Sequence, residues 1–153
     1  MVKCISLLGS TGSIGWQTLD VAKKLGIPVA ALTAGSNVEK LARQCEEFHP
    51  KLAVLGTEEA AKRLQQLVPG QEIAWGEEGL LRAASMEEAD CVVTAVMGMV
   101  GLKPTLAAID AGKRVALANK ETLVCAGDLV MARARARGVE IVPVDSEHSA
   151  IFQ

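Results

Sequence analysis

Leu7-Leu8-Gly9-Ser10-Thr11-Gly12-Ser13-Ile14-Gly15 follows a short apolar run and opens an amphipathic one. The glycines in this stretch are spaced G-x-x-G-x-x-G. Compared with the fingerprint of dinucleotide-binding loops, Gly12 and Gly15 stand at the second and third glycine positions, and Ser10 replaces the first. Glycine at the second position lets the backbone approach a pyrophosphate closely. Glycine at the third lets the following helix pack tightly on the strand.

This loop is expected to bind the phosphates of a dinucleotide through backbone amides of residues 11–14 at the start of a helix. The hydroxyls of Ser10, Thr11 and Ser13 would add hydrogen-bond donors. The alternative is an ordinary glycine-rich turn between a strand and a helix. The strand–turn–helix context near the start of the chain favours dinucleotide binding.

Short apolar runs alternate with amphipathic segments along the whole chain. The expected strands are Lys3–Leu8, Val29–Thr33, Leu52–Leu55, Glu72–Trp75, Cys91–Ala95, Val115–Ala118 and Glu140–Val144. The expected helices are Ile14–Leu25, Val38–Glu47, Glu58–Val68, Glu77–Ala84, Leu102–Ala111 and Glu121–Arg137. Several strands are apolar throughout, which indicates a parallel sheet covered on both faces. We therefore predict one α/β domain, doubly wound and Rossmann-type, with a mostly parallel sheet of about seven strands and helices on both faces.

The composition narrows the class of partner. With 153 residues, half of them apolar, the chain is long enough to form a full hydrophobic core. Sixteen basic and 18 acidic residues are spread along it and there is no Tyr, so no nucleic-acid partner is expected. The longest apolar run, Cys91–Leu102, is too short to span a bilayer, and the first residues lack a signal-peptide layout. We expect no membrane association and a cytoplasmic location.

The four cysteines, Cys4, Cys45, Cys91 and Cys125, form no C-x-x-C pair. They are expected to be reduced, buried and structural, as in a cytosolic protein. A zinc site is not expected.

The end of the second strand bears on the choice of cofactor. NAD enzymes usually carry an acid about 20 residues after the glycines, which binds the ribose hydroxyls. Here the strand ends in Gly35-Ser36-Asn37, and no acid appears before Glu39. The absence of that carboxylate removes a repulsion against a 2′-phosphate and favours NADP. Asn37 as a simple helix cap is an equally good explanation of that residue.

Two later loops carry further candidates. The loop after the fifth strand, Ala95–Leu102, contains two glycines that would let a nicotinamide ring approach the backbone; a turn with core methionines is the alternative. Asn119-Lys120-Glu121 follows the sixth strand. Lys120 would meet an anionic or hydroxylated substrate, and Glu121 would accept a hydrogen bond from a ribose or nicotinamide. A plain solvated helix start explains these residues equally well.

The last expected strand runs into Asp145-Ser146-Glu147-His148. In extended backbone Asp145 and Glu147 project to the same side, and paired carboxylates suit Mg²⁺ or Mn²⁺. Ser146 would donate to a substrate hydroxyl. The alternative is a helix start with acids favoured by the helix dipole. His148 alone is a poor metal candidate.

Four motifs stand in order at fitting distances: Gly9–Gly15, Ala34–Asn37, Ala118–Glu121 and Val144–His148. Through them the whole chain resembles the amino-terminal part of the 1-deoxy-D-xylulose 5-phosphate reductoisomerases. The resemblance implies an NADPH-dependent and metal-dependent conversion of 1-deoxy-D-xylulose 5-phosphate to 2-C-methyl-D-erythritol 4-phosphate, in the non-mevalonate route to isoprenoids. It also implies a phosphosugar substrate, a homodimer, and Mg²⁺, Mn²⁺ or Co²⁺ as the cation.

The resemblance implies roles for individual residues. The cofactor-binding residues would be Gly9, Thr11, Gly12, Ser13, Ile14, Gly35, Ser36, Asn37, Asn119 and Glu121. Substrate would be bound by Lys120, Ser146 and Glu147, of which Lys120 and Glu147 would be catalytic, and the metal by Asp145 and Glu147.

The sequence departs from the family pattern at Ser36, where many relatives carry a basic residue, and this weakens the implied grip on the 2′-phosphate. By the resemblance, residues 1–153 are an NADPH-binding domain that ends at the start of the metal motif. A third acidic metal ligand, the phosphate-binding residues and a mobile loop lie further along in the family. These 153 residues alone are therefore expected to be inactive.

Overall fold

The computed structural model describes residues 2–96, 98–118 and 120–144, with the backbone alone at residues 120, 121 and 123. Its strands are β1 (Ile5–Leu8), β2 (Val29–Thr33), β3 (Leu52–Leu55), β4 (Ile73–Trp75), β5 (Cys91–Thr94), β6 (Arg114–Leu117) and β7 (Ile141–Pro143). Its helices are α1 (Ser13–Leu25), α2 (Val38–Phe48), α3 (Glu58–Leu67), α4 (Gly76–Ala84), the 3₁₀ helix η1 (Gly98–Gly101), α5 (Leu102–Asp110) and α6 (Lys120–Arg137). The predicted bounds agree to within two residues, and only η1 was not predicted.

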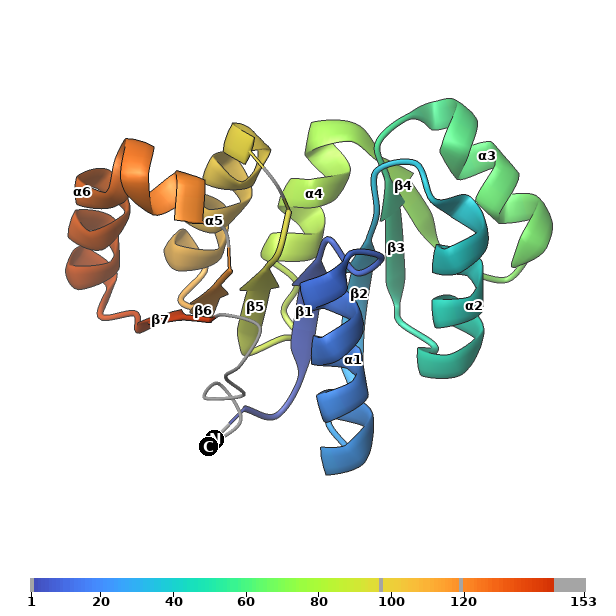
Figure 1. The fold of residues 1–153 in the computed structure, drawn as a ribbon, viewed down its shortest axis with the longest axis horizontal. Coiled ribbons are helices and arrows are strands. Elements are labelled where there is room, and N and C mark those ends of the chain that lie inside the picture. Colours follow the sequence, from blue (N-terminus) through green and yellow to red (C-terminus); the bar gives the residue numbers. More distant parts are fainter. Residues whose placement is uncertain (1, 97, 119, 145–153) are drawn as a thin grey trace.

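The strands form one sheet in the order β4-β3-β2-β1-β5-β6-β7, and every neighbouring pair is parallel. This confirms the predicted doubly wound architecture (Figure 1). The order reverses between β1 and β5, which is the position where open α/β sheets bind their ligands, outside the carboxyl ends of the strands.

Helices cover both faces of the sheet and explain why the strands are apolar throughout. One buried cluster contains Leu19 of α1, Leu41 of α2 and Leu64 of α3, and the other contains Ala84 of α4, Ile109 of α5 and Val130 of α6. Successive strand side chains point to opposite faces. Leu7 of β1 accordingly belongs to the first cluster and Leu8 to the second.

The helix ends follow local sequence signals. The Asn37 side chain caps α2 by accepting a hydrogen bond from the Lys40 amide at 3.2 Å, and Thr57 caps α3 in the same way. Gly26 ends α1 with a φ of 69°. The predicted sixth helix is interrupted at Ala126, where φ is −140°. The neighbouring Gly127 explains the weak point, because glycine is a poor helix former.

The expectation that all four cysteines are buried was wrong for two of them. All four are free, but Cys125 is exposed and Cys4 is half-buried, whereas Cys45 and Cys91 are buried. Cys4 precedes β1 instead of lying within it, and Cys125 lies next to the interruption of α6. Within the described parts of the chain, no helix is both long and apolar enough to cross a membrane.

Candidate dinucleotide-binding site

The strand register brings the loops of the site to one edge of the sheet. Leu8 of β1 pairs with Thr33 of β2 and with Thr94 of β5, and Thr94 pairs with Leu117 of β6. The segments that follow these residues therefore leave the sheet side by side. Hydrogen bonds continue past the strand ends, for example from the Ala95 amide to the Leu8 carbonyl at 2.8 Å.

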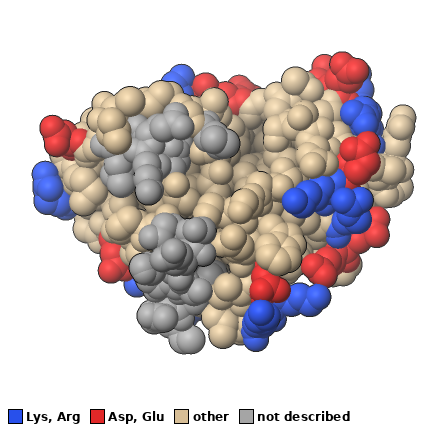
Figure 2. Space-filling view, in the orientation of Figure 1, with Lys and Arg blue, Asp and Glu red and all other residues tan. Residues whose placement is uncertain are grey.

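A cavity of about 620 Å³ lies at this edge. Its lining comes from the segments after β1, β2, β3, β4 and β5 and from the start of α5. Glycine and apolar residues dominate, and the polar lining residues are Thr11, Thr33, Glu77 and Lys103. In Figure 2 the charged side chains of the described residues lie mainly around the rim of the face shown, and the described residues at its centre are mostly uncharged. A mostly apolar cavity with a few polar groups is typical of small-molecule and cofactor sites.

The glycine loop meets the geometry that its spacing predicts. Gly9 has a φ of +88°, and a Cβ there would lie 2.7 Å from the Ala95 carbonyl oxygen. A Cβ on Gly15 would lie 2.3 Å from the Gly9 carbonyl oxygen, which confirms that the third glycine permits close packing of α1. A Cβ on Gly12 would meet no atom within 4 Å.

The loop also supplies free amides. The first hydrogen bond of α1 runs from the Trp16 amide to the Gly12 carbonyl at 2.9 Å. The amides of residues 13–15 therefore belong to the group that an α-helix leaves without an internal partner. Thr11 and Gly12 line the cavity.

The expectation that the Ser10 hydroxyl faces a phosphate was wrong. Ser10 is fully buried, and its Oγ lies 3.2 Å from the Thr33 carbonyl oxygen and 2.7 Å from Gln44 Oε1. The hydroxyl thus turns into the protein toward α2. Thr11 is half-buried and Ser13 is exposed, so their exposure is compatible with the predicted role.

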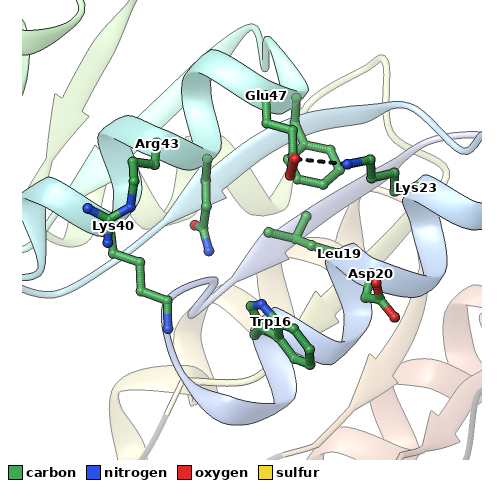
Figure 3. A pocket seen from close by; sticks show the side chains of 9 residues that line it. Trp16, Leu19, Asp20, Lys23, Lys40, Arg43 and Glu47 are labelled. Atoms are coloured by element: carbon green, nitrogen blue, oxygen red, sulfur yellow. Dashed lines mark hydrogen bonds and ion pairs between the residues drawn. The ribbon is translucent and has the colours of Figure 1, made fainter.

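Two residues that contact the loop were not predicted from the sequence. Gln44 Nε2 donates to the Ser10 carbonyl at 2.9 Å, and Lys40 Nζ donates to the Thr11 carbonyl at 2.8 Å. Figure 3 shows the Lys40 side chain extending from α2 toward the start of α1. A signal was present: Gln44 lies among Leu41, Ala42 and Cys45 on the buried side of α2, and a buried amide requires partners.

The segment after β2 presents Gly35, Ser36 and Asn37 to solvent, and Gly35 lines the cavity. The helix-cap interpretation of Asn37 is confirmed, because its Oδ1 accepts from the Lys40 amide. This cap uses the side-chain oxygen and is compatible with a further role for the amide nitrogen.

The alternative interpretation of the loop after β5, a turn with methionines in the core, does not hold for Met99. Residues 98–101 form η1, and Met99 and Val100 are 45% and 62% exposed and line the cavity. Their apolar side chains therefore face the space where a ligand would lie. Met97 is outside the described residues.

The predicted catalytic, substrate-binding and metal-binding side chains all lie outside the described part of the structure. Asn119, Asp145, Ser146, Glu147 and His148 lie outside the described residues, and Lys120 and Glu121 are described only as the backbone that opens α6. The strand before the acidic motif does reach the cavity's edge of the sheet, because Pro143 of β7 pairs with Leu117. Among the described residues, no group of three or more His, Cys, Asp or Glu is placed to hold a metal ion.

The described groups with clearly shifted pKa values lie away from the cavity. Burial raises the pKa of the Cys45 thiol to about 11 and that of Cys91 to about 12, and it also raises the pKa of Cys4. A hydrogen bond from Lys51 lowers the pKa of Glu88. None of these residues lines the cavity.

Comparisons with known proteins agree with the sequence motifs. The family model of 1-deoxy-D-xylulose 5-phosphate reductoisomerase matches residues 5–127. The protein of that name from Ruminiclostridium cellulolyticum is 54% identical over 155 residues, which cover all of this chain and 41% of the relative. The chain thus spans about two fifths of the length of the relatives it matches.

Solved structures agree as well. The Zymomonas mobilis reductoisomerase in complex with NADPH is 44% identical with a TM-score of 0.89, over 100% of this chain and 41% of that one. A DOX-P reductoisomerase in complex with NADPH, fosmidomycin and magnesium is also 44% identical with a TM-score of 0.89, over 99% of this chain and 38% of that one. Because the family model matches from the first strand into α6, the chain belongs to the 1-deoxy-D-xylulose 5-phosphate reductoisomerase family.

Proposed function

We propose that residues 1–153 form the NADPH-binding domain of an enzyme that isomerises and reduces 1-deoxy-D-xylulose 5-phosphate to 2-C-methyl-D-erythritol 4-phosphate. The observation that carries this proposal is the cavity at the reversal of strand order, lined by the glycine loop. In open α/β sheets this is the position where dinucleotides bind. Membership of the family supplies the reaction.

Two glycines indicate where the cofactor fits. A Cβ on Gly12 or on Gly35 would meet no protein atom within 4 Å, and neither residue has a positive φ. Both line the cavity. Nothing within the described protein therefore requires glycine at either position, whereas a phosphate or sugar close to the backbone would.

In this arrangement the cofactor lies across the carboxyl ends of β1, β2 and β5. The pyrophosphate would be bound at Thr11, Gly12, Ser13 and Ile14, after the turn made by Gly9. The adenosine ribose and its 2′-phosphate would lie at Gly35, Ser36 and Asn37, and the nicotinamide half near Asn119 and Glu121.

The preference for NADPH over NADH is supported by charge at the end of β2. No acidic residue stands between Gly35 and Val38, so nothing there repels a 2′-phosphate. Lys40, in the first turn of α2, brings an ammonium group within 2.8 Å of the glycine loop. Its charge compensates in part for the neutral Ser36.

The substrate and metal roles remain with the acidic motif. We propose that Asp145 and Glu147 bind Mg²⁺, Mn²⁺ or Co²⁺, that Lys120, Ser146 and Glu147 bind the phosphosugar, and that Lys120 and Glu147 are the catalytic residues. A bound cation would polarise substrate oxygens as a Lewis acid, and NADPH would supply hydride. For the full-length protein we also propose a homodimer, which sedimentation can test.

Calorimetric titration of residues 1–153 with NADPH and NADH tests the cofactor assignment. We expect binding of NADPH with a micromolar or weaker dissociation constant, weaker binding of NADH, and no turnover of substrate. Absence of heat with both cofactors, or a preference for NADH, would overturn the assignment.

Manganese binding to the full-length protein tests the metal ligands. Asp145→Asn removes one proposed anionic ligand, so we expect a large loss of Mn²⁺ affinity. Asp20→Asn, on α1, is the matched control and should bind Mn²⁺ normally. Unchanged Mn²⁺ affinity in Asp145→Asn would show that this carboxylate is not a ligand.

A further inference from the structure

Helix α2 holds two successive carbonyl groups of the glycine loop. Gln44 Nε2 donates to the Ser10 carbonyl at 2.9 Å, and Lys40 Nζ donates to the Thr11 carbonyl at 2.8 Å. The two side chains are four residues apart and so lie on one face of the helix. Both line a hollow of about 470 Å³ between α1 and α2, shown in Figure 3.

Both polar atoms of the Gln44 side-chain amide take part in this contact. Its Nε2 binds the Ser10 carbonyl, and its Oε1 accepts from Ser10 Oγ at 2.7 Å. The residue is only 8% exposed. If the side chain turned away, its buried donor and acceptor would lose their hydrogen-bond partners. Leaving such groups unpaired costs free energy, so the side chain is held in this orientation.

Because of peptide geometry, these contacts also fix the direction of the N–H groups in the same peptide groups. In a trans peptide group the carbonyl and the N–H point in opposite directions. The carbonyls of Ser10 and Thr11 point toward α2, so the N–H groups of Thr11 and Gly12 point away from it. Thr11 and Gly12 line the cavity, whereas Gln44 and Lys40 line the separate hollow between α1 and α2.

We propose that Gln44, assisted by Lys40, is a positioning residue that orients the amides of the glycine loop for the cofactor's pyrophosphate. The proposal rests on the NADPH-binding function proposed above. With Gln44 in place the loop has its binding geometry before the ligand arrives. Without it, ordering the loop is a cost at each binding event, and affinity falls.

The test compares two ligands in the full-length protein. NADPH contains the pyrophosphate, and adenosine 2′-monophosphate contains the adenosine and 2′-phosphate without it. For Gln44→Leu we expect the dissociation constant of NADPH to rise about tenfold, the effect of losing one buried hydrogen-bond pair, while that of adenosine 2′-monophosphate changes less than about twofold. The ratio of the two constants separates positioning from general loss of structure.

Gln65→Leu is the matched control, because it removes a glutamine of α3 that also binds backbone carbonyls, those of Val68, Pro69 and Gln71. It should leave both constants unchanged. Ser10→Ala removes only the hydroxyl that fixes Gln44 Oε1, and it serves if Gln44→Leu does not fold. We expect it to weaken NADPH about threefold and to spare the monophosphate.

Each outcome has a definite meaning. If the unaltered protein binds neither ligand, the proposed function fails. If it binds both, and the folded Gln44 and Ser10 variants either keep their NADPH affinity or lose both ligands equally, the positioning role is refuted and NADPH binding stands.

Discussion

Gly12 and Gly15 provide a paired test of the glycine loop, because alanine at these two positions should fail in opposite ways. Gly15→Ala should damage the fold, and Gly12→Ala should damage binding alone. The two variants differ in the space around the added Cβ, which the structure defines for both.

At Gly15 the added Cβ would lie 2.3 Å from the Gly9 carbonyl oxygen and 2.7 Å from two backbone atoms of Ser10. Ordinary van der Waals contact begins near 3.4 Å, and none of these atoms can rotate away. Helix α1 would have to shift from the sheet by about 1 Å. Overpacking of this kind costs about 1–3 kcal/mol or more. For a chain of this size, the melting temperature should fall by about 3 °C for each kcal/mol.

At Gly12 the added Cβ meets nothing within 4 Å, and the backbone φ of −83° is accessible to alanine. The free energy of unfolding should change by less than about 1 kcal/mol, because alanine lowers the conformational entropy of the unfolded chain, which stabilises the fold, but is a poorer N-cap than glycine, which destabilises it. The same methyl would occupy the path of the pyrophosphate. We expect the dissociation constant of NADPH to rise about 10-fold to 100-fold through steric exclusion.

Thermal unfolding by circular dichroism and calorimetric titration with NADPH measure the two effects on the same samples. We expect Gly12→Ala to be stable but to bind NADPH poorly, and Gly15→Ala to be unstable. Native NADPH affinity in Gly12→Ala would refute the placement of the pyrophosphate. Native stability in Gly15→Ala would refute the packing argument.

Further predictions concern the thiols, the first strand and cofactor preference. At pH 8 a thiol reagent should label exposed Cys125 first, and Cys45 and Cys91 only on unfolding. Burial raises the pKa of Cys45 to about 11 and that of Cys91 to about 12 in the folded protein, so the unfolded state loses these protons at lower pH. The free energy of unfolding, measured by urea denaturation, should therefore fall as the pH rises above 9. Asp90→Ala removes the carboxylate that binds the backbone amides of residues 3 and 4, so the free energy of unfolding should fall by about 1 kcal/mol in urea titration, and an unchanged midpoint would contradict this. Lys40→Met should lower the preference for NADPH over NADH about fivefold at low salt, the effect expected of one partly exposed charge, and an unchanged ratio of dissociation constants would exclude Lys40 from discrimination.

Much of the fold could be predicted because each strand can be recognised from its own residues. Runs such as Leu52–Leu55 and Cys91–Val93 are apolar on both sides, and only a sheet covered on both faces buries both. Helix ends were predictable where a local residue ends the helix, as Gly26 does at α1. The helix η1 was not, because the glycines at its two ends are typical of a loop.

The site could be predicted only where its signals are local in sequence. The glycine spacing and the capping role of Asn37 are patterns within a few residues. The direction of the Ser10 hydroxyl depends on Gln44, which lies 34 residues later and meets Ser10 only because α2 packs beside the loop. A single sequence does not reveal such a pair unless a polar residue on a buried helix face is taken as evidence for a distant partner.

The departure of the loop from the dinucleotide fingerprint has a structural explanation. The first glycine of that fingerprint serves the tight turn after the strand. Here Gly9, one residue earlier, makes that turn with a φ of +88°, and Ser10 does not need a positive φ. Position 10 can therefore carry a side chain, and its hydroxyl joins Gln44 in the network that fixes the loop. The replaced glycine thus removes no feature that phosphate binding needs, and it gives α2 a contact through which to hold the loop.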